Sequence, residues 1–188
     1  YFTAHQSELN DADYVIAQLE TPIDDVYNLL VAAKEAKKVT ILNPAPAPDT
    51  IPDLVLSHID FLTPNETELA KVAGMPTETI PEITAAAEAL LQRGVGNVLV
   101  TVGSRGALLC NRNGSHLYPA YPQKAVDTTA AGDTFNAAFA VALAEGWTMD
   151  EAIVFANAAA GLSVTRKGAQ TSIPCRSEVL DFMRDHAL

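Results

Sequence analysis

Short apolar runs alternate with longer amphipathic stretches through the first hundred residues, and this alternation restricts the fold more than any other feature. The short runs are rich in branched and aromatic side chains and predict strands at residues 13–19, 39–42, 61–63 and 98–102. The longer stretches place apolar side chains at helical spacing, most clearly over residues 22–33 and 80–93. Strands and helices that alternate in this way predict an α/β fold with a parallel sheet and right-handed crossovers.

Local signals set the expected boundaries of these elements. Thr21 followed by Pro22 predicts a helix start with Thr21 as the N-cap, and Asn65 with Glu68 has the spacing of a capping box. The Asn113–Gly114 pair predicts a hairpin at the edge of the sheet. Further helices are expected over residues 3–10, 132–145, 149–164 and 176–184.

Length and charge restrict the class of protein. The 188 residues fit one domain, residues 1–188, and a net charge of −11 argues against nucleic acid or anionic lipid as a partner. The chain has no apolar run of 18 residues and no signal peptide, which favours a soluble protein away from membranes. Two cysteines without metal-ligand or disulfide spacing fit a reducing cytoplasm. The first residue is Tyr1, so we expect N-terminal sequence to be missing.

Residues 127–143, DTTAAGDTFNAAFAVAL, form a loop of small residues that leads into an apolar helix. Backbone N–H groups of Ala130, Ala131 and Gly132 would be accessible to an anion at the positive end of the helix dipole. Asp133 would lie beside that anion as a candidate general base, which points to phosphoryl transfer. The same residues also fit an ordinary capped helix with a close-packed alanine face.

The common nucleotide-binding motifs are absent, because the chain has neither GxxxxGK[ST] nor GxGxxG. Three segments that follow predicted strands remain as candidates for holding phosphates: residues 65–68, 101–106 and 127–133. The carboxyl ends of parallel strands meet at one edge of a sheet, where ligands of α/β proteins gather. The alternatives are a plain capping box at 65–68 and an ordinary glycine turn at 103–106.

Five motifs, taken in order, resemble those of the PfkB-type sugar kinase family. They are NPAPA at 43–47, TPNETE at 63–68, TVGSRG at 101–106, DTTAAGDTFNAA at 127–138 and TRKGAQTSIP at 165–174. The resemblance begins near residue 13 and continues through almost all of the remaining chain. NPAPA and TRKGAQ narrow it toward the ribose kinases of the family.

The resemblance implies a three-layer α/β/α sandwich with a mostly parallel sheet and an antiparallel edge hairpin. The family's first strands, its sugar-covering lid and its GGKGxN-type glycine pair have no counterpart in this chain. The fold would therefore be truncated, with most of the sugar pocket absent. The family's lid forms a dimer, so a homodimer is expected for the full-length form.

The resemblance also assigns roles to individual residues. Asp133 would be the base that deprotonates the primary hydroxyl of D-ribose, with Ala130, Ala131 and Gly132 as the anion hole. The ATP site, with Mg²⁺ held through its phosphates, would involve Asn65, Glu68, Thr101, Val102, Gly103, Ser104, Arg105, Gly106, Gly132 and Asn157. Glu20 and Asp133 would bind the sugar. K⁺ would be enclosed by Asp127, Thr129, Ser163, Arg166, Gly168 and Ser172.

Alternative interpretations accompany several of these assignments. Asn157 alone on an alanine-rich helix is more typical of a packing residue, and Glu20 before Thr-Pro fits a helix-start acid. The substrate could also be deoxyribose, fructose or a nucleoside, and the chain could be a nucleotide-binding fragment without catalysis. We assign no role to the four histidines, His5, His58, His116 and His186.

Overall fold

The computed structural model describes residues 6–186, which divide into two compact units. The first unit contains the residues up to 101 together with 108–116, and the second contains 102–107 together with 117–186. The N-terminal helix predicted over 3–10 is α1 (Gln6–Asp11), and residues 3–5 of that prediction lie outside the described residues. One domain over residues 1–188 stays a prediction.

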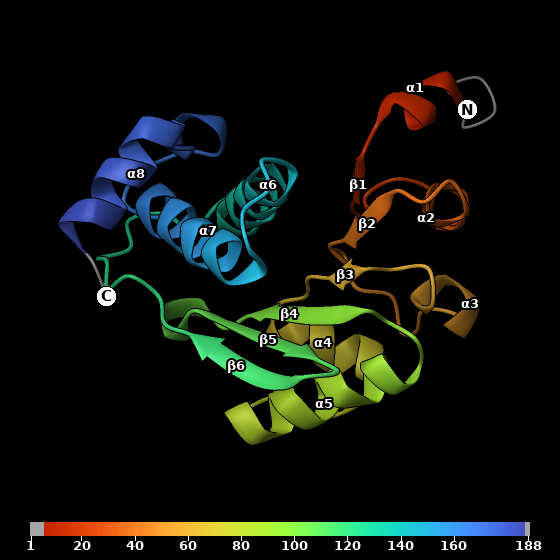
Figure 1. Cartoon of the computed structure of the whole chain (residues 1–188). Helices are drawn as coiled ribbons and strands as arrows, with labels where there is room; N and C mark the ends of the chain where they lie inside the picture. Colours follow the sequence, from red (N-terminus) through yellow and green to blue (C-terminus); the bar gives the residue numbers. More distant parts are fainter. Residues whose placement is uncertain (1–5, 187–188) are drawn as a thin grey trace. The chain divides into compact units, whose positions relative to one another are not determined.

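The first unit is built on a sheet whose six strands follow the order of the chain (Figure 1). They are β1 (Tyr14–Ala17), β2 (Val39–Leu42), β3 (Phe61–Leu62), β4 (Asn97–Thr101), β5 (Ala107–Asn111) and β6 (Gly114–Tyr118). β1 to β4 are parallel, with Ile16 opposite Ile41 and Leu62 opposite Val98. The β-α alternation of the sequence therefore predicted the parallel part of the sheet correctly.

The predicted hairpin is present, but its turn lies one residue earlier than expected. Arg112 and Asn113 form the turn between β5 and β6, and Gly114 already belongs to β6. The side-chain oxygen of Asn111 accepts a hydrogen bond from the Asn113 N–H at 2.9 Å. A bond of this kind, from the side chain of an asparagine to the N–H two residues on, stabilises a turn that begins at Asn111.

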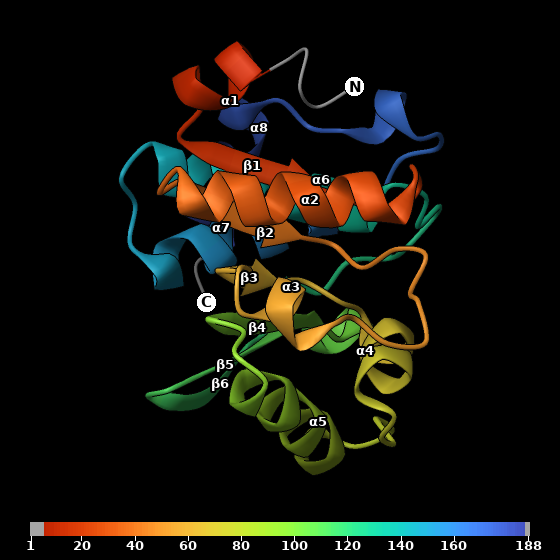
Figure 2. The same cartoon turned by 90° about the vertical axis from the view of Figure 1, so that its right-hand side faces the viewer.

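Helices of the first unit pack on one face of its sheet, as Figure 2 shows for α2 (Ile23–Glu35), α3 (Asp53–Leu56) and α5 (Ile80–Gln92). The buried side of α2 carries Val26, Leu30 and Ala33, and that of α5 carries Ile83 and Leu90. α4 (Glu66–Ala73) ends at Gly74, which adopts φ 66°. The apolar stripes thus orient each helix toward the sheet.

The start of α2 corrects one prediction. Pro22, rather than Thr21, occupies the N-cap position, and no side chain caps this helix. Pro22 has an extended ψ of 119°, so helical geometry begins only at Ile23. The predicted position of proline inside the helix was wrong by one residue.

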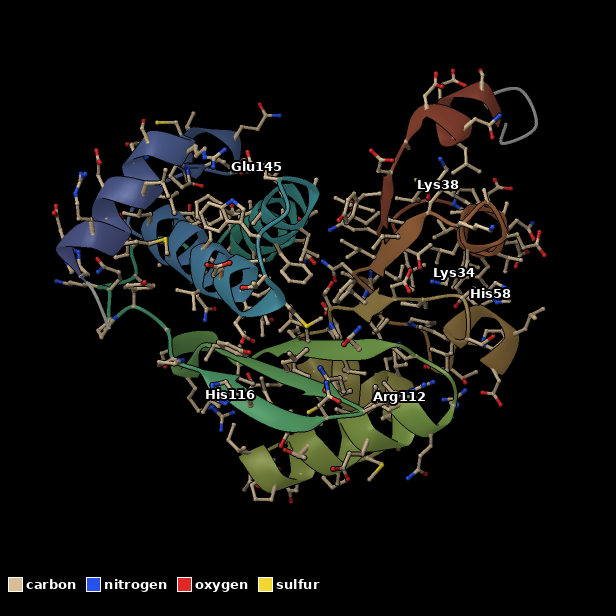
Figure 3. The ribbon with its side chains drawn as sticks, viewed as in Figure 1. Lys34, Lys38, His58, Arg112, His116 and Glu145 are labelled. Carbon is tan, nitrogen blue, oxygen red and sulfur yellow. The ribbon has the colours of Figure 1, made fainter. Side chains whose placement is uncertain are left out.

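The second unit consists mainly of α6 (Ala131–Ala144), α7 (Met149–Ser163) and α8 (Arg176–Asp185). α7 buries four alanines against its surroundings, at positions 152, 156, 158 and 159, and small side chains allow helices to approach closely. Glu145, labelled in Figure 3, forms an ion pair with Arg176 of α8. None of the helices within residues 6–186 is long and apolar enough to span a bilayer.

Candidate active site

The candidate catalytic segment begins at an unusual helix start. Ala130 occupies the N-cap position of α6 with φ 61° and ψ 14°, a left-handed conformation. For an alanine this conformation costs about 1–2 kcal/mol, and strained residues of this kind concentrate at functional sites. Alanine also offers no side-chain acceptor, so its side chain satisfies none of the first N–H groups of α6.

The donors of this turn differ in their surroundings. The Ala131 N–H donates to the Thr128 carbonyl at 3.2 Å, a long bond within the turn. Gly132 lies in the first turn of α6, and a Cβ added to it would meet no atom within 4 Å apart from its chain neighbours and the backbone of its own helix. Open space therefore borders the backbone at Gly132, as expected for a position that an anion approaches.

Asp133 is the third residue of α6 and its only acidic residue in the first turn. Its side chain is exposed. A carboxylate at this end of a helix is stabilised by the helix dipole. The structure thus places the candidate base one residue beyond the open backbone of Gly132.

Asp127 links the catalytic segment by hydrogen bonds to the loop that contains Gly168. One carboxylate oxygen of Asp127 accepts from the Thr129 N–H at 3.0 Å, and the other from the Gly168 N–H at 2.9 Å. The bond from Gly168, followed by that from Thr129, lowers the pKa of Asp127 to about 2. The Val126 and Asp127 N–H groups also donate to the Val164 carbonyl, at 2.7 and 3.2 Å. Segments about 40 residues apart are therefore held together on either side of one carboxylate.

The other residues of the predicted cation site surround the same two loops. Ser163 and Ser172 are fully buried, and their hydroxyls donate to the Ala160 and Ala169 carbonyls. The guanidinium of Arg166 pairs with Glu178 at 2.6 Å. The Arg166 guanidinium is itself a cation and offers no oxygen, so carboxylate, hydroxyl and backbone carbonyl oxygens are the candidate donors for a hard cation. The described residues contain no cluster of three or more His, Cys, Asp or Glu side chains arranged for a metal.

Asn65 and Glu68 form a complete capping box at the start of α4. The Asn65 N–H donates to Glu68 Oε2, and the Glu68 N–H donates to Asn65 Oδ1, both at 2.8 Å. Asn65 Nδ2 donates to the other Glu68 oxygen, also at 2.8 Å. Burial raises the pKa of Glu68, although the Asn65 N–H opposes this shift. The capping interpretation is therefore confirmed, and both carboxylate oxygens already accept hydrogen bonds.

Thr101 lies beside this capping box. Its N–H donates to the Pro64 carbonyl at 3.0 Å, and Asn65 and Thr101 form an isolated parallel bridge. Glu20 follows β1, where the Leu19 N–H donates to the Ala45 carbonyl of the proline loop. The first unit thus has Thr101 at the carboxyl end of β4, and Glu20, Asn65 and Glu68 follow the carboxyl ends of other parallel strands, the usual place for ligands in such sheets.

The predicted nucleotide turn at 103–106 is a short 3₁₀ helix, Gly103–Arg105, closed by a bond from the Val102 N–H to the Gly106 carbonyl. A Cβ on Gly106 would collide with the Tyr118 carbonyl, whereas one on Gly103 would meet no atom within 4 Å. Packing therefore explains Gly106. Only Gly103 has the open surroundings that would let a ligand approach.

Asn157 on α7 is buried, and its amide donates to the Tyr118 and Pro119 carbonyls at 3.2 and 3.3 Å. These bonds fit the packing interpretation, and its contact with adenosine stays a prediction. The predicted site residues are divided between the units. Glu20, Asn65, Glu68 and Thr101 lie in the first unit, and the remainder, from Val102 to Ser172, lie in the second.

Comparison with known proteins agrees with this arrangement of strand-end motifs. The model of the pfkB family of carbohydrate kinases matches residues 2–176. The chain belongs to the pfkB carbohydrate kinase family. Within this family it is 41% identical over 182 residues to the ribokinase of Haemophilus influenzae, covering 97% of the chain and 59% of that protein. The deoxyribokinase of Salmonella typhi is 35% identical over 176 residues, covering 94% of the chain and 58% of that protein.

A solved structure of a pfkB-family relative gives the same result for the fold. Arabidopsis thaliana ribokinase, complexed with ribose and ATP, superposes with a TM-score of 0.92 at 40% identity. The match covers 96% of this chain and 59% of that one. The predicted α/β class, with a mostly parallel sheet and antiparallel edge strands, is confirmed. The chain spans about 59% of the length of these relatives.

Some residues that shape the site were not predicted. Thr134 and Asn136 bond back to the first turn of α6, and Glu178 holds Arg166. Thr134 and Asn136 each lie four residues after the residue whose carbonyl they bind, so this spacing is a signal that the sequence offers. Nothing in the local sequence indicates the Arg166–Glu178 pair, which depends on the path of the chain.

Proposed function

We propose that the full-length protein transfers the γ-phosphoryl group of ATP to the 5-hydroxyl of D-ribose. The observation that carries this proposal is the start of α6, where the left-handed Ala130 leaves open backbone at Gly132 and Asp133 follows directly. The family is one of carbohydrate kinases, and the named relatives of highest identity are ribokinases.

In this proposal Asp133 accepts the proton of the sugar hydroxyl as that hydroxyl attacks the γ-phosphorus. N–H groups of Ala130, Ala131 and Gly132 stabilise the charge on the equatorial oxygens, and such preorganised donors are a large term in phosphoryl transfer. Glu20 binds sugar hydroxyls. The nucleotide lies along Asn65, Glu68, the 101–106 segment and Asn157.

The proposal includes two cations and a cellular setting. Mg²⁺ would neutralise the phosphates of ATP and be oriented by Asn65 and Glu68 through water, which can donate to the Glu68 oxygens beside the bonds that they already accept. K⁺ would be enclosed by Asp127 and carbonyls of the 129 and 163–172 segments. The full-length form would be a cytoplasmic homodimer without nucleic-acid or membrane partners, in keeping with the net charge of −11.

Deoxyribose is the second candidate substrate, because a deoxyribokinase is 35% identical to this chain. The test is ADP release by the full-length protein with Mg²⁺-ATP and a panel of ribose, deoxyribose and fructose. We expect the highest kcat/KM with ribose and a higher rate in potassium than in a bulky organic cation. A clear preference for another sugar would contradict the assignment of ribose.

The same assay applied to the 188-residue chain tests the fragment alternative. A nucleotide-binding fragment would bind an ATP analogue with Mg²⁺ and show no sugar-dependent ADP release. Turnover of ribose by this chain at the full-length rate would contradict that alternative.

A further inference from the structure

Two buried polar side chains interrupt the apolar face of α6 close to its start. Thr134 is 3% exposed and Asn136 is 5% exposed. Thr134 Oγ1 donates to the Ala130 carbonyl at 2.8 Å, and Asn136 Nδ2 donates to the Gly132 carbonyl at 2.9 Å. Both bonds reach back four residues and end on carbonyls of the anion turn, residues 130–133.

A peptide group is planar, so holding its carbonyl also fixes the direction of the N–H that follows it. The plane of the Gly132 carbonyl contains the N–H of Asp133, and the plane of the Ala130 carbonyl contains the N–H of Ala131. The side chains of Asn136 and Thr134 therefore add to the helical bonds that fix two peptide groups at the start of α6. One contains the N–H of Ala131, which belongs to the proposed anion hole. The other is the Gly132–Asp133 peptide, from which the side chain of the candidate base extends. Misplacement of catalytic groups by about 1 Å can cost about 10²-fold in rate.

The amide oxygen of Asn136 lowers the free energy of unfolding. Its Oδ1 is buried, and no donor within residues 6–186 hydrogen-bonds to it. A buried acceptor without a partner costs about 1–3 kcal/mol. The opposite orientation of the amide would bring two acceptor oxygens together, so the nitrogen must face Gly132. The hydrogen bond that stabilises the Asn136 amide is the one that it donates to the Gly132 carbonyl in the anion turn.

We propose that Asn136 is a positioning residue for phosphoryl transfer, which orients the Gly132–Asp133 peptide through its amide nitrogen. This inference rests on the proposed kinase function. It assigns Asn136 an indirect role, through the backbone, and gives a reason for a buried amide on the core face of α6.

The test compares Asn136→Ser with Asn136→Ala in the full-length protein. The two replacements are similar in volume, but only the serine hydroxyl can bond back to the Gly132 carbonyl, as Thr134 does to Ala130. We expect Asn136→Ala to lower kcat about 10-fold to 100-fold, with the KM for ATP almost unchanged, and Asn136→Ser to restore most of it. The proposal would be overturned if kcat were equal in the two variants. It would also be overturned if Asn136→Ala changed the KM for ATP by as large a factor as kcat.

A matched pair separates positioning from helix stability. Thr134→Val removes the hydroxyl bond at the anion turn, and Thr84→Val removes the same kind of bond from Thr84 to the Ile80 carbonyl in α5. The melting temperature of each variant reports its effect on stability, and only Thr134→Val should lower kcat. Equal effects on kcat would mean that the loss reflects stability.

A spectroscopic measurement keeps the inference distinct from the proposed function. The amide resonance of Asp133 in the ¹⁵N-labelled 188-residue chain should shift in Asn136→Ala and return toward the wild-type position in Asn136→Ser. If the full-length wild type phosphorylates no sugar, the proposed function has failed, and this resonance still reports on the peptide. The same resonance position in both variants would overturn the positioning role.

Discussion

The starts of α4 and α6 carry a carboxylate at the same helical position but differ in the residue at the N-cap. Glu68 and Asp133 are each the third residue of their helix. In α4 the N-cap is Asn65, and the two side chains satisfy each other's backbone N–H groups. In α6 the N-cap is Ala130, which has no acceptor and lies in the left-handed region.

The N-cap residue therefore decides what a helix start can do. An amide at the cap closes the first turn of α4 on itself and stabilises the helix. An alanine at the cap of α6 offers no side-chain acceptor to the first N–H groups, and its left-handed conformation costs backbone strain. The carboxylate at the third helical position completes a capping box in α4, and at the same position in α6 it is the candidate base.

Asp133→Asn should produce the largest effect of the predicted substitutions, a loss of kcat that the start of α4 would not show. Removal of a general base lowers kcat about 10²-fold to 10⁴-fold, whereas the affinity for an ATP analogue should stay within about twofold. Steady-state kinetics and calorimetry on the full-length protein measure both. The control is Asp25→Asn, an exposed carboxylate in the first turn of α2, which should leave kcat unchanged. Equal losses of kcat and nucleotide affinity would make Asp133 a structural residue.

Asn65→Ala should have a smaller effect, chiefly on stability. Loss of an N-cap side chain lowers the free energy of unfolding by about 1 kcal/mol, measured by urea denaturation. Thr79→Ala is the matched control, because Thr79 and Glu82 form the same capping box at α5. If Asn65 also orients Mg²⁺-ATP, only Asn65→Ala should weaken nucleotide binding. If both variants bind the nucleotide with the same affinity, Asn65 acts only as the N-cap of α4.

The smallest effects are those of pH on Asp127 and Glu68, and they should have opposite signs. The folded-state pKa of Asp127 is lowered from 3.8 to about 2, so its contribution to stability is present above pH 4 and is lost as the pH falls toward 2. The pKa of Glu68 is raised by burial, so its contribution weakens as the pH rises through the folded-state value.

Urea denaturation of Asp127→Asn and Glu68→Gln between pH 3 and pH 7 tests these signs. The deficit of Asp127→Asn relative to wild type should grow as the pH rises, and that of Glu68→Gln should shrink. Parallel pH profiles for the two variants would show that the two carboxylates have similar environments after all.

Local sequence signals predicted most elements because they act over a few residues. The capping box at Asn65, the helix over 80–93 and the parallel strands all depend on near neighbours and on the spacing of apolar side chains. The two corrections, at Thr21 and at the Asn113–Gly114 turn, also concern single residues at boundaries. There, competing local bonds and the geometry of proline decide the last residue.

The segment at 127–143 was identified from its small residues and its one carboxylate, and its family from the order of five motifs. The sequence by itself therefore determined the α/β class, the helix that begins near Gly132 and the residue types offered for catalysis. It did not determine the left-handed conformation of Ala130, which a glycine or asparagine would have indicated.

Only the tertiary structure brought Asp127 to the Gly168 N–H and Arg166 to Glu178, because no local rule links residues so far apart in the chain. It also decided that the Glu68 carboxylate is satisfied by Asn65 and that Asn136 faces the Gly132 carbonyl with a buried oxygen left over. Burial and hydrogen-bond partners depend on how the whole chain packs. The sequence specifies which donors and acceptors are present, and the packing of the chain determines which of them form hydrogen bonds.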